Sequence, residues 1–274
     1  MKLKNLNNRV VLITGAGSGM GRATALLAAQ RGAILVICDR DEAGLNETAR
    51  AIRSLGNEVF AQTVDVTDPE AMDAFADAVH ARFEAVDLLI NNAGIGVLAP
   101  FLHTKPEDWD RQIAVNVKGV VHGCERFIPR MIERGAGGQV VNVSSGAGYF
   151  PSTVMTAYSV TKFAVLGLTL NLRIELRPHK IGVTAICPGV MNTPIARTSI
   201  VRGSDPDGQA ARVRSMYERR GYPPERAAQK VLRAAERNRA IAPVGPDAHA
   251  MYWLNRLAPP LARWVSARTT HLFD

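Results

Sequence analysis

The chain has 274 residues, of which 47% are apolar and 21% are charged, which is ordinary for a globular protein. No stretch approaches 18 consecutive apolar residues, and the N-terminus lacks the pattern of a signal peptide. We therefore expect neither a membrane-spanning helix nor secretion.

Cysteine and histidine usage narrows the chemistry further. Cys38, Cys124 and Cys187 are too few and too scattered for a disulfide framework, so we expect buried thiols and a cytoplasmic protein. The six histidines form no pair with ligand spacing, so no metal site is predicted.

The net charge of +8 is concentrated near the C-terminus, where residues 195–274 contain 14 Lys and Arg against 7 Asp and Glu. The arginines are dispersed and no base-stacking motif accompanies them, so we expect no nucleic-acid partner. A solvated helix face or a subunit contact is the simpler interpretation.

Short apolar runs alternate with amphipathic stretches through the first two hundred residues. Strands are predicted at 9–14, 33–39, 58–66, 86–91, 138–145 and 182–189. Helices are predicted at 19–31, 41–55, 68–82, about 107–134, and 157–177. Because the strands are continuously apolar, they suit a parallel sheet that is covered on both faces. The sequence predicts an α/β fold with a doubly wound, Rossmann-like parallel sheet, formed by residues 1–274 as one domain.

The pattern weakens after Pro188. Residues 195–223 are polar, rich in arginine and contain GSDPDG, which predicts a mobile segment within a substrate lid at about 190–223. A helix at 223–238 and a strand at 240–245 are predicted to complete the sheet. The C-terminal tail, about 247–274, is amphipathic and is broken by Pro259-Pro260.

A glycine-rich stretch, TGAGSGMG at 14–21, follows the first strand and begins a helix. Glycines let the backbone turn tightly and approach a pyrophosphate, whose charge is stabilised at the helix N-terminus. The position predicts a dinucleotide site, with contacts from Gly15, Ser18, Gly19 and Met20.

The second strand ends at Asp39, 24 residues beyond Gly15. A carboxylate there accepts hydrogen bonds from the adenosine ribose and repels a 2′-phosphate, so NAD is the predicted cofactor. Arg40 follows directly and could turn toward such a phosphate, which keeps NADP as the alternative.

Further motifs follow in chain order. They are Asp65-Val66, Asn91-Asn92-Ala93-Gly94, Asn116, Ser145, the YxxxK of Tyr158 and Lys162, and Pro188-Gly189. With the glycine-rich turn, this set closely resembles the short-chain dehydrogenase/reductase family in its single-domain form, over about residues 7–194. The resemblance implies an NAD(P)-dependent enzyme that transfers hydride between CH–OH groups and the nicotinamide.

Tyr158 and Lys162 lie four residues apart, which places them on one helix face. The ammonium, together with the charge of an oxidised nicotinamide, is expected to lower the phenol pKa and make Tyr158 the general acid/base. In the family the lysine also binds the nicotinamide ribose. Either Ser144 or Ser145 could hold the substrate oxygen on chemical grounds, and the family spacing of 13 residues before Tyr158 selects Ser145.

Asn116 matches the family residue that anchors a water beside the lysine, whereas by itself it would predict a core hydrogen bond to backbone. The family also implies that Asp65 and Val66 contact the adenine. The other implied contacts are with the adenosine ribose and the nicotinamide, from Asn92, Ala93, Gly94, Pro188, Gly189, Val190 and Thr193.

Side chains beyond the strand ends are expected to form the substrate pocket. Most are apolar, which favours a hydrophobic secondary alcohol or ketone: Val97, Leu98, Tyr149, Phe150, Met191 and Ile195. These side chains could instead only pack the lid. Arginines in and near the lid offer an acidic group as another alternative: Arg197, Arg202, Arg212 and Arg214.

The tail, with its tryptophans and arginines, suits either a subunit interface, which we favour, or a membrane surface that delivers lipid-like substrates. The family implies a homotetramer or homodimer. A catalytically idle dinucleotide sensor is the remaining alternative.

Overall fold

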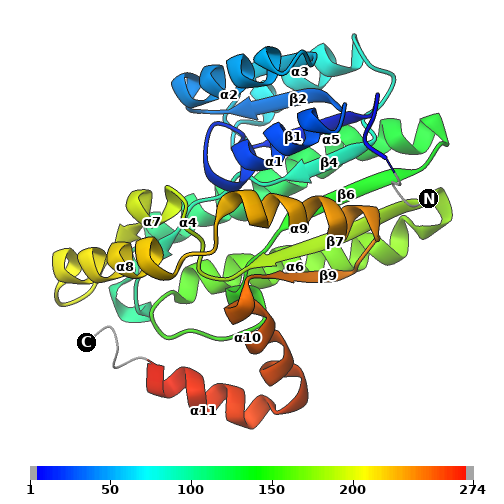
Figure 1. Cartoon of the computed structure of the whole chain (residues 1–274). Coiled ribbons are helices and arrows are strands. Elements are labelled where there is room, and N and C mark those ends of the chain that lie inside the picture. Colours follow the sequence, from blue (N-terminus) through cyan, green and yellow to red (C-terminus); the bar gives the residue numbers. More distant parts are fainter. Residues whose placement is uncertain (1–4, 270–274) are drawn as a thin grey trace.

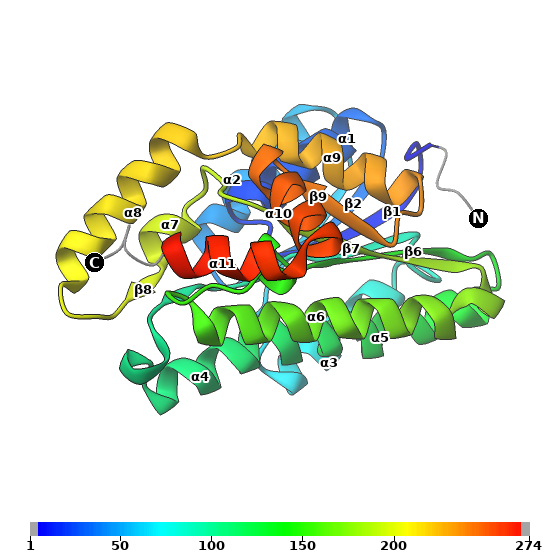
Figure 2. The same ribbon diagram turned by 90° about the horizontal axis from the view of Figure 1, so that it is seen from below.

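The computed structural model describes residues 5–269 and has three layers, with a parallel sheet between two layers of helices (Figures 1 and 2). The seven strands of the sheet follow the order β3-β2-β1-β4-β6-β7-β9, and every neighbouring pair is parallel. Their bounds are β1 (Val10–Thr14), β2 (Ile34–Asp39), β3 (Val59–Thr63), β4 (Leu88–Asn91), β6 (Gly138–Val143), β7 (Ile181–Pro188) and β9 (Ile241–Val244). The predicted doubly wound fold is confirmed.

Burial explains why these runs are strands. Every residue of β1, β4, β6 and β7 is buried, whereas the edge strand β3 is only partly so. A strand covered on both faces needs apolar side chains at consecutive positions, and most positions of these four strands are apolar. β3 is shorter than the predicted 58–66 because its pairing with β2 ends at Thr63.

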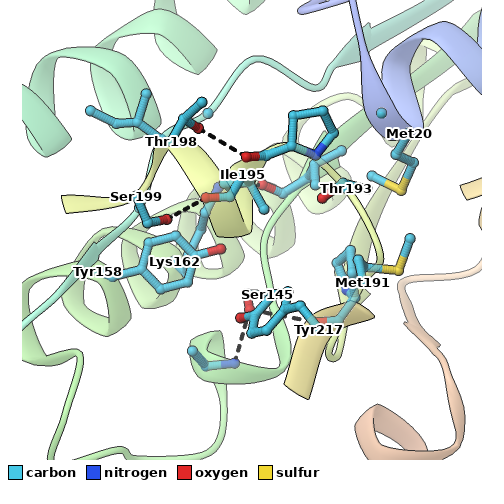
Figure 3. A pocket seen from close by; sticks show the side chains of 18 of the residues that line it. Met20, Ser145, Tyr158, Lys162, Met191, Thr193, Ile195, Thr198, Ser199 and Tyr217 are labelled. Carbon is cyan, nitrogen blue, oxygen red and sulfur yellow. Dashed lines mark hydrogen bonds between the residues drawn. The ribbon is translucent and has the colours of Figure 1, made fainter. Parts of the chain in front are cut away.

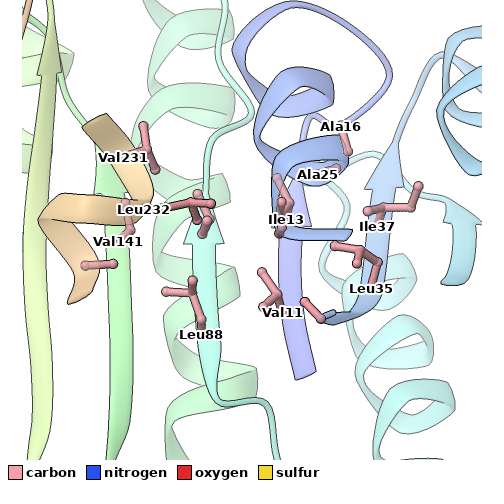
Figure 4. Packing of buried hydrophobic residues seen from close by; sticks show 14 of the residues in the cluster. Val11, Ile13, Ala16, Ala25, Leu35, Ile37, Leu88, Val141, Val231 and Leu232 are labelled. Carbon is pink, nitrogen blue, oxygen red and sulfur yellow. The ribbon is translucent and has the colours of Figure 1, made fainter. Parts of the chain in front are cut away.

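Helices α1 (Gly19–Gln30), α2 (Glu42–Ser54) and α9 (Pro224–Glu236) cover one face of the sheet (Figure 2). Figure 4 shows this core, in which Val11 and Ile13 of β1 lie near Leu35 of β2, and Leu232 of α9 packs over the sheet. Helices α3 (Pro69–His80), α5 (Gly119–Arg134) and α6 (Thr156–Glu175) cover the other face around a second core that includes Phe75 and Phe127.

The helix predicted at about 107–134 is interrupted. It consists of α4 (Pro106–Ile113), a π-helical turn at Ala114–Lys118, and α5. A π turn holds an extra residue and is common at functional sites. One extra residue hardly changes the side-chain pattern of a helix, so the π turn could not be predicted from the sequence.

The segment 195–223, predicted to be mobile, contains secondary structure that the sequence did not predict. This stretch contains α7 (Ile195–Thr198), β8 (Ile200–Val201) and the 15-residue helix α8 (Pro206–Arg220). GSDPDG is a helix start, because the Asp205 carboxylate accepts a hydrogen bond from Gly208 N at 3.0 Å and Pro206 occupies the first turn. β8 pairs in parallel with β5 (Val97–Leu98), which forms a second, two-stranded sheet.

The C-terminal hairpin consists of α10 (Pro246–Leu257) and α11 (Pro259–Thr269), and the prolines fall at the start of the second helix as expected. Tyr149 Oη donates to Ala248 O at 2.7 Å and Ser266 Oγ to Pro151 O at 2.6 Å, so both helices are fastened to the segment after β6. Residues 270–274 of the predicted tail lie outside the described residues. Within 5–269, no helix has the length and apolarity needed to cross a bilayer.

Candidate active site

A cavity of about 1400 Å³ opens at the carboxyl ends of the parallel strands. It includes the point where the strand order reverses between β1 and β4, the usual ligand site of doubly wound sheets. All the predicted cofactor residues line it: Gly15, Ser18, Gly19, Met20, Asp39, Arg40, Asp65, Val66, Asn92, Ala93, Gly94, Tyr158, Lys162, Pro188, Gly189, Val190 and Thr193.

The turn between β1 and α1 requires its glycines. Gly15 and Gly19 have φ of 67° and 52°, a region that side chains disfavour. A Cβ on Gly21 would lie 2.1 Å from the Gly15 carbonyl oxygen, so no side chain fits there. Asn92 Nδ2 donates to the carbonyls of Thr14 and Gly15 at 2.9 and 3.0 Å, so Asn92 fastens the turn to the end of β4. This rigid turn at a helix N-terminus fits a dinucleotide pyrophosphate.

Asp39, at the end of β2, accepts hydrogen bonds from Gly17 N at 2.8 Å and Asp41 N at 3.0 Å. Its carboxylate is therefore fixed beside the glycine-rich turn. Arg40 is exposed and forms no hydrogen bond or ion pair with a residue that the structure describes. Sequence reasoning missed Arg22, which bonds to the Gly17 carbonyl from Nε at 3.0 Å and lines the same end of the cavity.

Tyr158 and Lys162 lie one turn apart on α6, near Ser145, which follows β6 (Figure 3). The Lys162 ammonium donates to Val143 O at 3.0 Å and lies 5.6 Å from the centroid of the Tyr158 ring. The two candidate serines differ. Both line the cavity, but Ser144 is buried and its hydroxyl is already committed to Lys162 O at 2.7 Å, whereas Ser145 is only partly buried and its Oγ accepts from Ala147 N at 3.1 Å. The geometry favours Ser145 for a substrate oxygen.

Burial dominates the electrostatics of the pair. It raises the pKa of the Tyr158 hydroxyl, with a further increase from Tyr217 and an opposing effect from the hydrogen bond with Ser145. Burial lowers the pKa of Lys162 to about 8. The protein alone therefore favours a neutral phenol, contrary to the expected lowering. That expectation also counted the charge of an oxidised nicotinamide, which acts only when the cofactor is bound.

Asn116 does not line the cavity and is fully buried in the π turn. Its Oδ1 accepts from Ile95 N at 2.9 Å, and its Nδ2 donates to Ile95 O at 3.0 Å and to Thr161 Oγ1 at 3.1 Å. The side-chain amide thus makes the core hydrogen bonds to backbone that the residue alone predicts. It links the segment after β4 to α6.

The end of the cavity beyond Tyr158 is mainly apolar. Of the predicted substrate residues, Leu98, Phe150, Met191 and Ile195 line it, whereas Val97 and Tyr149 do not. Sequence reasoning missed the contributions of α8 and the C-terminal hairpin: Val213, Met216, Tyr217, Ala250, Met251, Leu254 and Val265. These residues lie far along the chain from the motifs, so no sequence pattern connects them to the site.

The lid arginines have different surroundings. Arg202 is committed to Asp108, with Nη2 2.9 Å from Oδ1 and a second bond from Nε, so it is not available to an acidic substrate. Arg212 lines the cavity, whereas Arg197 and Arg214 are exposed and do not. An acidic substrate group could therefore meet only Arg212 among these four arginines.

Asp247, near the start of α10, is another missed residue. Its Oδ2 accepts a hydrogen bond from Val190 N at 2.6 Å, and the residue lines the cavity. The Asp247 carboxylate, from an element near the C-terminus, thus fixes the Pro188-Gly189-Val190 segment. No motif signals a contact between residues 57 positions apart.

A sequence profile of the short-chain dehydrogenases matches residues 9–201. The chain is 42% identical over 259 residues to "Probable oxidoreductase EphD" of Mycobacterium tuberculosis, covering 93% of this chain but only 44% of that protein. It is 38% identical over 208 residues to 3beta-hydroxysteroid dehydrogenase 1 of Eggerthella lenta, covering 76% and 78% of the two chains. A solved short-chain dehydrogenase/reductase of Burkholderia phymatum, in complex with NAD, superposes with a TM-score of 0.86 at 31% identity, covering 94% of this chain and 96% of that one.

These findings define a dehydrogenase-like fold of the Rossmann type. The chain belongs to the short-chain dehydrogenase family, as its motifs indicated.

Proposed function

We propose that the protein is an NAD-dependent oxidoreductase that transfers hydride between the nicotinamide and a secondary alcohol or ketone with a hydrophobic body. One observation carries the proposal. Tyr158, Ser145 and Lys162 converge in a single cavity, between a dinucleotide turn at one end and an apolar compartment at the other.

NAD is preferred to NADP because the carboxylate of Asp39 is held beside the glycine-rich turn by two backbone N–H groups. A fixed negative charge there disfavours a 2′-phosphate. The NAD complex of the Burkholderia phymatum relative supports the same choice. Arg40 would be the residue to receive a phosphate in NADP.

Each site residue has a defined task in ketone reduction. Ser145 holds the substrate oxygen, and Tyr158 donates its proton to that oxygen as negative charge develops. Lys162 binds the nicotinamide ribose and stabilises the phenolate that remains. Bound NADH supplies the hydride that forms the new C–H bond. The relay that returns a proton to Tyr158 is assigned to Asn116 on the family pattern alone, because its side-chain amide is bonded to Ile95 and Thr161 and does not line the cavity.

A panel of secondary alcohols supplied with NAD, read by NADH absorbance, tests this function. We expect turnover of alcohols with a sizeable hydrocarbon portion and little with small polar sugars. If NADH binds but no alcohol or ketone in the panel reacts, the sensor alternative gains and the enzyme proposal fails.

Location and assembly form a further part of the proposal. The described thiols, Cys38, Cys124 and Cys187, are free and buried, which suits a reducing cytoplasm. The outer face of the C-terminal hairpin exposes large apolar side chains, including Trp253 and Trp264. Aromatic residues and arginine favour protein interfaces, so this face supports a homodimer or homotetramer. A membrane surface that delivers lipid-like alcohols or ketones is the alternative for the same face.

A further inference from the structure

Helix α8 turns one face toward the substrate end of the cavity. The cavity-lining residues of this face follow helical spacing: Arg212, Val213, Met216, Tyr217 and Arg220. Val213 and Met216 offer hydrocarbon, whereas the two arginines are exposed. Tyr217 brings a hydroxyl group into the apolar compartment, so it is the polar group of this face that a buried ligand would meet first.

The position of α8 is fixed from both ends. Before it, β8 pairs with β5 and Arg202 is bound to the buried Asp108. After it, Tyr222 N donates to Val190 O at 2.8 Å. The helix is therefore attached to the same segment that is expected to hold the nicotinamide. A side chain carried by such a helix is placed reproducibly relative to the reacting atoms.

The Tyr217 hydroxyl lies close to the catalytic groups and lacks a protein partner. It makes no hydrogen bond to a residue that the structure describes. It interacts electrostatically with Tyr158, and Figure 3 places it beside Ser145. Burial and the charge of Asp247 raise its pKa, so it stays a neutral donor at physiological pH. A partly buried donor without a partner gains from any acceptor that a ligand provides.

Resting on the function proposed above, we propose that Tyr217 is a specificity-determining residue that donates a hydrogen bond to a second oxygen of the substrate. Ser145 and Tyr158 are committed to the oxygen on the reacting carbon. Tyr217 comes from a different element, α8, so it reaches an acceptor one methylene beyond the reacting carbon of the same molecule. The fitting substrate class is a ketone or alcohol with a carbonyl close to the reacting carbon, as in β-keto and β-hydroxy esters, and with an apolar remainder.

Two probes of equal chain length separate this proposal from general packing. Ethyl acetoacetate has a second carbonyl one methylene away from its ketone, and 2-heptanone has none. The full chain is assayed with NADH, and wild type is compared with Tyr217→Phe on both ketones. We expect the substitution to lower kcat/KM for ethyl acetoacetate by about 10-fold, the value of one hydrogen bond. For 2-heptanone, kcat/KM should stay within about twofold. For each ketone, the variant is compared with wild type, and the two fold-changes are then compared. The two ketones are not compared directly, because they differ in intrinsic reactivity.

Tyr222→Phe is the matched control, because that side chain packs against the core cluster and does not line the cavity. It should leave both ketones unchanged. Equal losses on the two ketones, or no loss on ethyl acetoacetate, would overturn the role of Tyr217.

A binding measurement covers the case in which neither ketone is reduced. The affinity of the enzyme–NADH complex for each ketone is then read from NADH fluorescence. Selective weakening of ethyl acetoacetate in Tyr217→Phe supports the inference even though the proposed reaction fails, and equal affinities in both variants overturn it.

Discussion

Lys162 has to carry its charge in one of the most enclosed places in the protein. Its side chain is 3% exposed, and burial lowers its pKa from 10.5 to about 8. At neutral pH the folded protein must keep this amine protonated at a cost of roughly 3 kcal/mol. The residue thus lowers stability, a cost that fits its proposed roles of stabilising a phenolate and holding a ribose.

Lys162→Met should therefore abolish turnover and yet stabilise the protein at pH 7. The lost hydrogen bond to Val143 O takes about 1 kcal/mol from the stability gained by removing the buried charge. The remaining gain should raise the melting temperature by a few degrees. Between pH 8 and 10.5 the unfolded chain holds a proton that the folded wild type releases, so the advantage shrinks as pH rises. Thermal unfolding across this range measures it. The exposed Lys118→Met is the control, and a Lys162→Met variant less stable at pH 7 would contradict the argument.

Tyr158→Phe removes the proton donor and leaves the ring in place. We expect ketone reduction to fall by at least about 100-fold, with NADH affinity unchanged by fluorescence titration. Because burial raises the pKa of Tyr158, wild-type reduction should be level across neutral pH while alcohol oxidation increases with pH. Full activity of the variant on a confirmed substrate would refute the assignment.

Asp39→Asn removes the charge that disfavours NADPH but keeps an acceptor for the glycine-rich turn. NADPH affinity should rise by about 10-fold or more relative to NADH, since the charge difference is worth over 1 kcal/mol. Adding Arg40→Ala should cancel much of that gain, because Arg40 is the exposed cation at hand. A wild type that already prefers NADPH would contradict this reasoning.

At the scale of elements, the buried strands and the glycine-rich turn could be predicted because each has a strong local cause. A mostly apolar run such as β7 is typical of a parallel strand that is covered on both faces. Gly15 adopts a positive φ, which other residue types disfavour. Helix α8 was missed because only Val213 is buried, so its apolar pattern was too sparse to distinguish from a polar loop.

The site divides in the same way. Tyr158 and Lys162 are four residues apart, so their proximity follows from helical geometry alone. Asp247 and Tyr217 reach the site through tertiary folding, from elements far along the chain, and no local rule brings them there. For Asn116, the residue type predicted a core hydrogen bond to backbone but could not say that the partner is Ile95.

The attachment of the lid gives a prediction at this scale. Arg202→Ala leaves the buried carboxylate of Asp108 without its cation, which destabilises the contact between α4 and the segment before α8. We expect a higher KM for the ketone with a smaller change in kcat, and faster proteolysis near residues 199–206. Arg202 holds the pKa of Asp108 below 3.8, so the stabilisation is present above that pH and is lost as the carboxylate is protonated.

Arg214→Ala is the control for this pair, because Arg214 is exposed and does not line the cavity. Replacing both partners, in Arg202→Ala with Asp108→Asn, should restore part of the lost stability, since no unpaired charge remains buried. A KM unchanged in Arg202→Ala would show that β5–β8 pairing alone holds the lid.

At the scale of the whole molecule, the C-terminal hairpin lines the substrate end of the cavity with one side and exposes apolar side chains on the other. Its inner side contributes Met251 and Leu254 to the cavity, while its outer side exposes Leu257, which is 76% exposed, together with the tryptophans. An apolar surface of this kind is costly in water unless something covers it. A partner bound to this face would also stabilise the hairpin residues that line the cavity.

We expect a second copy of the chain to cover the exposed apolar face of the C-terminal hairpin. The variant Trp253→Ser with Trp264→Ser should have a lower molecular mass by light scattering than wild type, because it loses the apolar anchors of a subunit contact. Its KM for hydrophobic ketones should rise as the hairpin loosens, whereas the exposed Arg214→Ala should alter neither property. Co-sedimentation with anionic vesicles separates the alternatives. A wild type that is monomeric and binds vesicles through these tryptophans would contradict the subunit contact and establish a membrane face, since the arginines beside them complement anionic lipid.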